Sequence, residues 1–176
     1  MSSRSPRRLS TLAVAGATAA VLGLGLAGCG AAGRPGNALV IDGRAVTSAE
    51  VAVATEQINS ALSGDRATEG QVVNLLALAP FVLAKAAETG AWAPDNQFNS
   101  FLAKITNPTP ATVEALRANS AYVVLTAEDR AALLTDMAKA SIQVDPRYGV
   151  LDYGTGFLGQ PTPEWIVTPA TAAPAQ

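Results

Sequence analysis

Histidine is absent from this 176-residue sequence, and cysteine occurs once, at Cys29. The lack of histidine excludes Ser-His-Asp and Cys-His catalysis, histidine-ligated zinc and a histidine proton shuttle near neutral pH. One cysteine excludes an intrachain disulfide and a cysteine cluster for a metal. We therefore expect no enzyme activity, no catalytic residue, no cofactor and no metal site; an enzyme would need chemistry that uses neither histidine nor a free thiol.

Aromatic residues are also scarce, at 5% of the sequence, and only 15% of the residues are charged. A β-sandwich of this size uses more aromatic and β-branched residues. The sequence is instead rich in alanine, and 49% of it is hydrophobic. Its length suits one domain with tails. This composition predicts a mainly α domain with a small β element.

Charge is missing altogether between Arg8 and Arg34, and the apolar run Leu9–Leu26 lies in this gap. Three arginines precede the run, and small residues follow it, which is the pattern of a secretory signal peptide. The run is followed closely by Cys29, in the sequence LAGC, the form of a lipoprotein signal. We expect residues 1–28 to be the signal peptide, with cleavage between Gly28 and Cys29 and a lipid on the Cys29 thiol.

The same stretch permits other interpretations. From Gly23, the letters GLGLAG fit the nucleotide-binding pattern G-x-G-x-x-G, but no strand precedes them and no helix or βαβ pattern follows. An uncleaved transmembrane anchor is an alternative, because about 20 apolar residues span a bilayer. The Arg7-Arg8 pair leaves twin-arginine export open beside the general secretory route. The lipoprotein and anchor interpretations both place the rest of the chain outside the cytoplasm.

Lipidation would fix the location of the protein. Each buried methylene contributes roughly 0.8 kcal/mol, so two or three acyl chains on Cys29 would hold it durably on the outer face of the cell membrane. Cleavage removes three arginines and leaves nine basic and fourteen acidic residues, a net charge of −5. An acidic domain without a basic cluster is not expected to bind nucleic acid.

The remaining sequence divides into a tether at 29–37, a domain at 38–153 and a tail at 154–176 that is rich in proline and alanine. In ALVIDGRAVT, Asp42-Gly43 predicts a two-residue hairpin turn. Capping boxes and apolar periodicity predict five helices: 48–63, 69–89 with a kink at Pro80, one starting at 94–95, one starting at 110, and one after 126.

Apolar spacing also predicts which faces are buried. The third predicted helix has Phe98, Phe101, Leu102 and Ile105 at i, i+3, i+4 and i+7. The second is apolar around most of its surface, so we expect it to be the central helix. For the fourth, the expected buried stripe is the set Val113, Leu116 and Val123.

Two places carry candidate contact residues. In the sequence VDPRYG, Arg147 beside Tyr148 is suited to bind a carboxylate or a peptide end, or alternatively Arg147 pairs with Asp145 or Asp152 as part of the structure. In the tail, Trp165 lies in the apolar stretch PEWIV and is a candidate contact to a peptide or a protein partner.

Three segments in this order resemble one family. ALVIDGRAVTSAEVAVATEQIN is similar to the opening of the N-terminal domain of SurA-type chaperones and PrsA-type foldases. VVNLLALAPFVLAKAAETG resembles the second helix of that domain, and VDPRYGVLD resembles a closing stretch of SurA-like lipoproteins of actinobacteria. Together the segments cover most of residues 38–152. The resemblance implies about five helices, with a closing strand at 142–144 that pairs with the hairpin near Val40.

The chain departs from this family in lacking room for the parvulin prolyl-isomerase domain, whose active site contains histidine. The resemblance therefore implies the chaperone-like module alone, which would bind unfolded or exported polypeptides without prolyl-isomerase activity. The alternative is a structural or assembly partner, a lipoprotein that docks on another cell-envelope protein.

Overall fold

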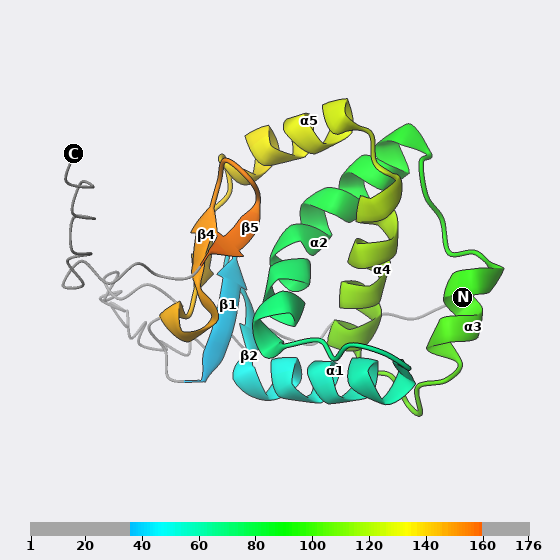
Figure 1. Ribbon diagram of the computed structural model, residues 1–176. Helices are drawn as coiled ribbons and strands as arrows, with labels where there is room; N and C mark the ends of the chain where they lie inside the picture. The colour runs from blue at the N-terminus through cyan, green and yellow to red at the C-terminus, as the bar shows by residue number, and fades with distance from the viewer. Residues whose placement is uncertain (1–35, 160–176) are drawn as a thin grey trace, which may run out of the picture.

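The structure, a computed structural model, describes residues 36–159 (Figure 1). This part of the chain contains five α-helices, five short strands and one 3₁₀ helix. In chain order they are β1 (Asn37–Ile41), β2 (Arg44–Thr47), α1 (Ser48–Ala61), α2 (Glu69–Thr89), α3 (Asn96–Leu102), α4 (Pro110–Val124), α5 (Ala127–Met137), β3 (Ile142–Val144), η2 (Pro146–Tyr148), β4 (Val150–Asp152) and β5 (Phe157–Gly159). The protein is mainly α with a small antiparallel β element, as the composition predicted.

The small sheet brings the two ends of the predicted domain together. Strands β1 and β2 form the expected hairpin, and Asp42 and Gly43 take the positive φ values of 47° and 85° that a tight two-residue turn requires. Strand β3 lies on the other side of β1, where Val40 is opposite Gln143. The Asp42 carboxylate also accepts a hydrogen bond of 2.9 Å from the Ser141 amide. The pairing that the family resemblance implied is therefore present.

The three predicted capping boxes all form, at Thr47, Thr68 and Thr126. In each, the threonine hydroxyl accepts a hydrogen bond from a backbone amide of the first turn, and a side chain three residues on accepts one from the threonine amide. At the first box, the hydrogen bonds from the Thr47 amide and hydroxyl hold the pKa of Glu50 below its ordinary value. Local sequence thus fixes where α1, α2 and α5 begin.

Helix α2 is the centre of the molecule and has the predicted bounds, with Gly90 at its C-terminal cap. Its first half packs in one hydrophobic cluster with the sheet, α1 and α4, and its second half packs in another with α5. The helix continues through Pro80, whose ring is exposed, and its path in Figure 1 is curved. Among the described residues, α2 alone has the length and hydropathy to cross a membrane, and half of its most apolar window is buried inside the domain.

Helix α4 packs closely along α2, but not through the predicted stripe. Its buried residues are mostly small: Thr112, Ala115, Leu116, Ala118 and Ala121. Of the predicted stripe, Leu116 is buried, Val113 is half-buried and Val123 is 67% exposed. The prediction was wrong for Val123 because alanines let the two backbones approach closely, so the buried face of α4 is set by small residues and not by large ones.

Helix α3 is shorter than the others and is set apart from the α1–α2–α4 body (Figure 1). Asp95 caps it, and its carboxylate accepts a 2.7 Å hydrogen bond from the Phe98 amide. Phe98 and Ile105 are buried in the main core, while Phe101 and Leu102 are half-buried. Trp92 contacts Phe98 edge to face, with ring centroids 5.5 Å apart. The buried Phe98, its contact with Trp92 and the buried Ile105 thus hold this helix.

A second hairpin, β4–β5, extends the folded body to Gly159, beyond the boundary expected at Tyr153. Gly156, with φ of 75°, turns the chain against α2 and α5 so closely that a Cβ there would lie 2.8 Å from Leu134. The Leu158 amide then donates a 2.7 Å hydrogen bond to the Asn74 side chain of α2. The hairpin was not predicted because its strands have only three residues each and lie among glycines. Such short strands show too little periodicity to be recognised in a sequence.

Candidate functional site: an apolar groove beside the central helix

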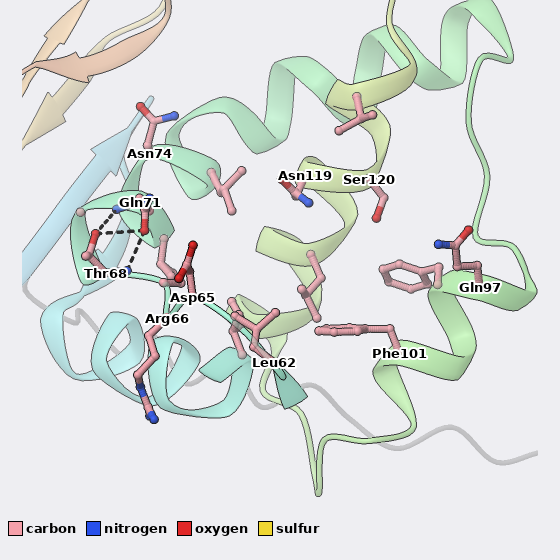
Figure 2. A pocket seen from close by; sticks show the side chains of 18 of the residues that line it. Leu62, Asp65, Arg66, Thr68, Gln71, Asn74, Gln97, Phe101, Asn119 and Ser120 are labelled. Carbon is pink, nitrogen blue, oxygen red and sulfur yellow. Dashed lines mark hydrogen bonds between the residues drawn. The ribbon is translucent and has the colours of Figure 1, made fainter. Parts of the chain in front are cut away.

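A groove of about 1220 Å³ opens between the first half of α2, the outer face of α4 and the helix α3 (Figure 2). The loop between α1 and α2 closes one side, and β5 contributes Phe157 and Leu158. The groove exists because α3 is held at a distance from α4 by the segments on either side of it (Figure 1).

One wall of the groove is a single face of α4. The lining residues of α4 are Leu116, Asn119, Ser120, Val123 and Val124, and their spacing of three and four residues places them on one broad face of the helix. Val123 and Val124 are 67% and 47% exposed. Two adjacent, exposed valines on an otherwise well-packed helix form an apolar surface that nothing in the described chain covers.

The opposite wall comes from α3 and is aromatic. Phe98 and Phe101 face the groove together with Trp92, which precedes the helix. Lys104 lies over the Phe101 ring, with its Nζ atom 5.7 Å from the ring centroid. An apolar side chain that enters the groove would therefore meet valines on one side and aromatic rings on the other.

The floor of the groove is the first half of α2, which contributes Val72, Leu75 and Asn74. Val72 and Asn74 are buried, and Leu75 is half-buried. The Thr68–Gln71 capping box lies at the rim, where Figure 2 shows its hydrogen bonds. The burial of these side chains and the capping box make the floor of the groove part of the folded core.

A few polar groups in the groove are free to bind a ligand. Asn119 and Ser120 on α4 and Gln97 on α3 line the groove (Figure 2), and none of their side chains makes a hydrogen bond to another described residue. Amide and hydroxyl groups of this kind bind the backbone of an extended chain through both its N–H and C=O groups. Apolar walls with a few convergent polar groups are typical of a binding site.

The charges in the groove are balanced and sparse. Asp65, Arg66, Asp95 and Lys104 line it, and the Asp95 carboxylate already caps α3. Within residues 36–159 no cluster of three or more acidic or cysteine side chains is placed to hold a metal ion. The groove therefore offers neither a phosphate-binding basic surface nor a set of metal ligands, and its chemistry is that of apolar contact.

The predicted contact pair Arg147 and Tyr148 is divided by the structure. Tyr148 lines one end of the groove, and its hydroxyl is buried without a hydrogen-bond partner in the described chain. Arg147 lies outside the groove lining: it donates a hydrogen bond to Ser48, lies 3.5 Å from the Asp145 carboxylate and stacks on the Tyr148 ring at 4.6 Å. Of these contacts, the one with Asp145 is one of the two pairs that the structural alternative named, while those with Ser48 and the Tyr148 ring were not predicted.

The other candidate residues are placed as follows. Asp152 accepts hydrogen bonds from Gly154 and Thr155 and so caps the turn between β4 and β5. Gly28, Cys29 and Trp165 lie outside the described residues. The lipidation site and the tail contact therefore stay predictions.

The groove-lining residues of α3 and α4 were not identified from the sequence. Asn119 and Ser120 are ordinary helix-surface residues in the sequence, and Val123 was assigned to the core. The one available indication is that Val123 and Val124 are adjacent, because two neighbouring helix positions are about 100° apart and do not both fit one narrow buried stripe.

In comparisons with known proteins, no family model, curated protein or solved structure matches this chain.

Proposed function

We propose that this domain is a chaperone-like module that binds apolar segments of unfolded or exported polypeptides, without prolyl-isomerase activity. The observation that carries the proposal is the groove, which combines apolar and aromatic walls with the unpaired side chains of Gln97, Asn119 and Ser120. A segment in the groove would bury its apolar side chains between α3 and α4 while these groups bind its backbone. The order of SurA-like sequence segments supports the same function.

Binding of this kind is weak and reversible. Burying three Val- or Leu-sized side chains contributes about 5–9 kcal/mol, and association costs at least about 4 kcal/mol. The small binding free energy that remains suits a module that holds a client briefly and releases it. The backbone contacts recognise any sequence, so selectivity comes only from apolar character.

The proposed place of action is the outer face of the cell membrane, where lipidated Cys29 would anchor the domain. Exported chains emerge there unfolded. The predicted tether at 29–37 would hold the groove within a short distance of them.

The test uses the chain from residue 29 to 176 with Cys29→Ser, which removes the acylation site. We expect it to suppress aggregation of a denatured secreted protein and to crosslink to it from a photo-reactive residue at position 120. Val123→Asp places a charge in the groove and is expected to weaken both effects about tenfold, which corresponds to roughly 1.4 kcal/mol.

Val53→Asp is the matched control, because Val53 is an exposed valine (42%) on α1 and lies outside the groove. It should leave both effects unchanged. A wild-type chain that neither suppresses aggregation nor crosslinks would contradict the proposed function, as would equal losses in the two variants.

The alternative, a lipoprotein that docks on another cell-envelope protein, has its own support in the β4–β5 hairpin. Val150 and Tyr153 there are 55% and 41% exposed and lie outside the groove. A fixed partner would be captured in envelope pull-downs by the wild-type chain and lost with Val150→Asp, while Val123→Asp would have no effect.

A further inference from the structure

The groove has a candidate occupant within the same chain, the tail that follows β5. Phe157 and Leu158, next to the last described residue Gly159, line the groove. The hydrogen bond from the Leu158 amide to Asn74 holds this strand against α2. The described chain therefore ends beside the groove wall.

The tail begins at the end of the groove where α4 exposes its valines. Phe157 contacts Tyr122 edge to face, with centroids 5.8 Å apart, and Tyr122 is followed by Val123. Along α4 the groove runs from Leu116 to Val124, about 12 Å at 1.5 Å per residue. The six steps from Gly159 to Trp165 reach up to about 20 Å when extended, so Trp165 can reach along the whole α4 wall of the groove.

The chemistry of the tail matches the groove. Trp165, Ile166 and Val167 form its longest apolar run, and the remaining residues are proline, threonine, alanine, glutamine and one glutamate. The glutamate, Glu164, is the only charged side chain after Gly159, whereas Lys104 at the groove has no carboxylate partner among the described residues. Pro161 and Pro163 lack N–H groups and restrict φ, which lowers the entropy that an extended segment loses on binding.

We propose that the segment Pro163–Val167 of the chain's own tail occupies the groove and competes with clients. The inference rests on the proposed function of the groove and adds its regulation. A segment tethered by a short linker has an effective concentration in the millimolar range. A client must therefore displace the tail, and only segments more apolar than the tail, or present in excess, gain access.

The first test maps the tail directly, in the chain from 29 to 176 with Cys29→Ser. A p-benzoylphenylalanine at position 165 keeps an aromatic side chain there and crosslinks to what surrounds it. We expect products of monomer mass, with the crosslink mapped to α3 or α4 residues of the groove. The same group at position 172 is the control and should give few groove crosslinks.

Products of dimer mass would overturn the proposal, because the occupant would then be the tail of a second copy. An absence of groove crosslinks from position 165 would overturn it as well.

The second test measures competition, with a fluorescent peptide of residues 160–170 added in trans. We expect the Trp165→Ala chain to bind this peptide about tenfold more tightly than the wild-type chain, because its own tail competes less. Adding Val123→Asp should abolish that binding, and adding Val53→Asp should not.

The two proposals fail differently. Equal binding of the peptide by wild-type and Trp165→Ala chains would overturn the self-occupancy and leave the groove as a peptide site. No binding of the peptide by either chain, with clients still held in the groove, would overturn the choice of occupant. Failure of the client assay itself is the outcome that contradicts the proposed function.

Discussion

Tyr148 combines two properties that are seldom found together in a folded domain. Its ring packs against the main core and under the Arg147 guanidinium, yet its hydroxyl is buried and has no hydrogen-bond partner in the described chain. A buried hydroxyl that loses its water without gaining a partner destabilises the fold.

Tyr148→Phe should therefore stabilise the domain, by about 1 kcal/mol, because the ring stays and only the unpaired hydroxyl is lost. Urea unfolding of the two proteins at equal m-value measures the difference. A loss of stability of similar size would show that the hydroxyl has a partner that the described residues do not include.

Gly156 is one of two glycines in the second hairpin, with Gly149, where a side chain would meet a close contact at a positive φ. A side chain there would have both a positive φ and a contact of 2.8 Å with Leu134. We expect Gly156→Ala to cost about 2–4 kcal/mol, from backbone strain and overpacking together.

Gly64→Ala is the matched control, since that position has open space and no positive φ. It should change the free energy of unfolding by less than about 0.5 kcal/mol. Equal costs at the two positions would contradict the close packing of β4–β5 on α2 and α5.

At the scale of whole elements, the features that were predicted correctly are those that depend on residues close together in the sequence. Helix starts came from capping boxes of four residues, and the first hairpin came from Asp42-Gly43, so each was determined by local chemistry. The buried face of α4 was not predicted correctly, because it depends on how closely α2 approaches. The groove could not be predicted at all, since it depends on where the segments around α3 place that helix.

The close approach of α4 to α2 predicts how substitutions on that helix will behave. Ala118 is fully buried on the face toward the core, whereas Val123 faces the groove. We expect Ala118→Leu to cost at least about 1–3 kcal/mol through overpacking. Val123→Leu should be within about 0.5 kcal/mol of wild type.

Thermal unfolding of the two single variants separates these outcomes. The reverse order of stability would mean that the predicted stripe through Val123 was correct and that the alanine face is not the packed one.

At the scale of the whole molecule, α2 joins two hydrophobic clusters into one cooperative body. Its first half contributes Val72 and Leu76 to the cluster with the sheet, and its second half contributes Leu78 and Val82 to the cluster with α5. A helix is cooperative along its length, so loss of either cluster weakens the other.

Leu133→Ala, in the α5 cluster, should thus cost about 2–5 kcal/mol and still leave a single unfolding transition. Hydrogen exchange of the α1 and α5 amides in increasing urea reports on the two clusters separately, because α1 packs in the main cluster and α5 in the second. Separate midpoints for the two signals would show that the clusters unfold independently.

The way in which α3 is attached bears on which side chains the groove could accommodate. Only Phe98 and Ile105 fix this helix region deeply in the core, and a segment of chain on either side connects it to α2 and α4. A wall anchored at two points can shift outward by a fraction of a side chain without disturbing the α2–α4 packing. In the proposed binding of an apolar segment, such a shift would let the distance between the two walls follow the size of the side chain that enters. The proposed binding site would then discriminate little between one apolar sequence and another.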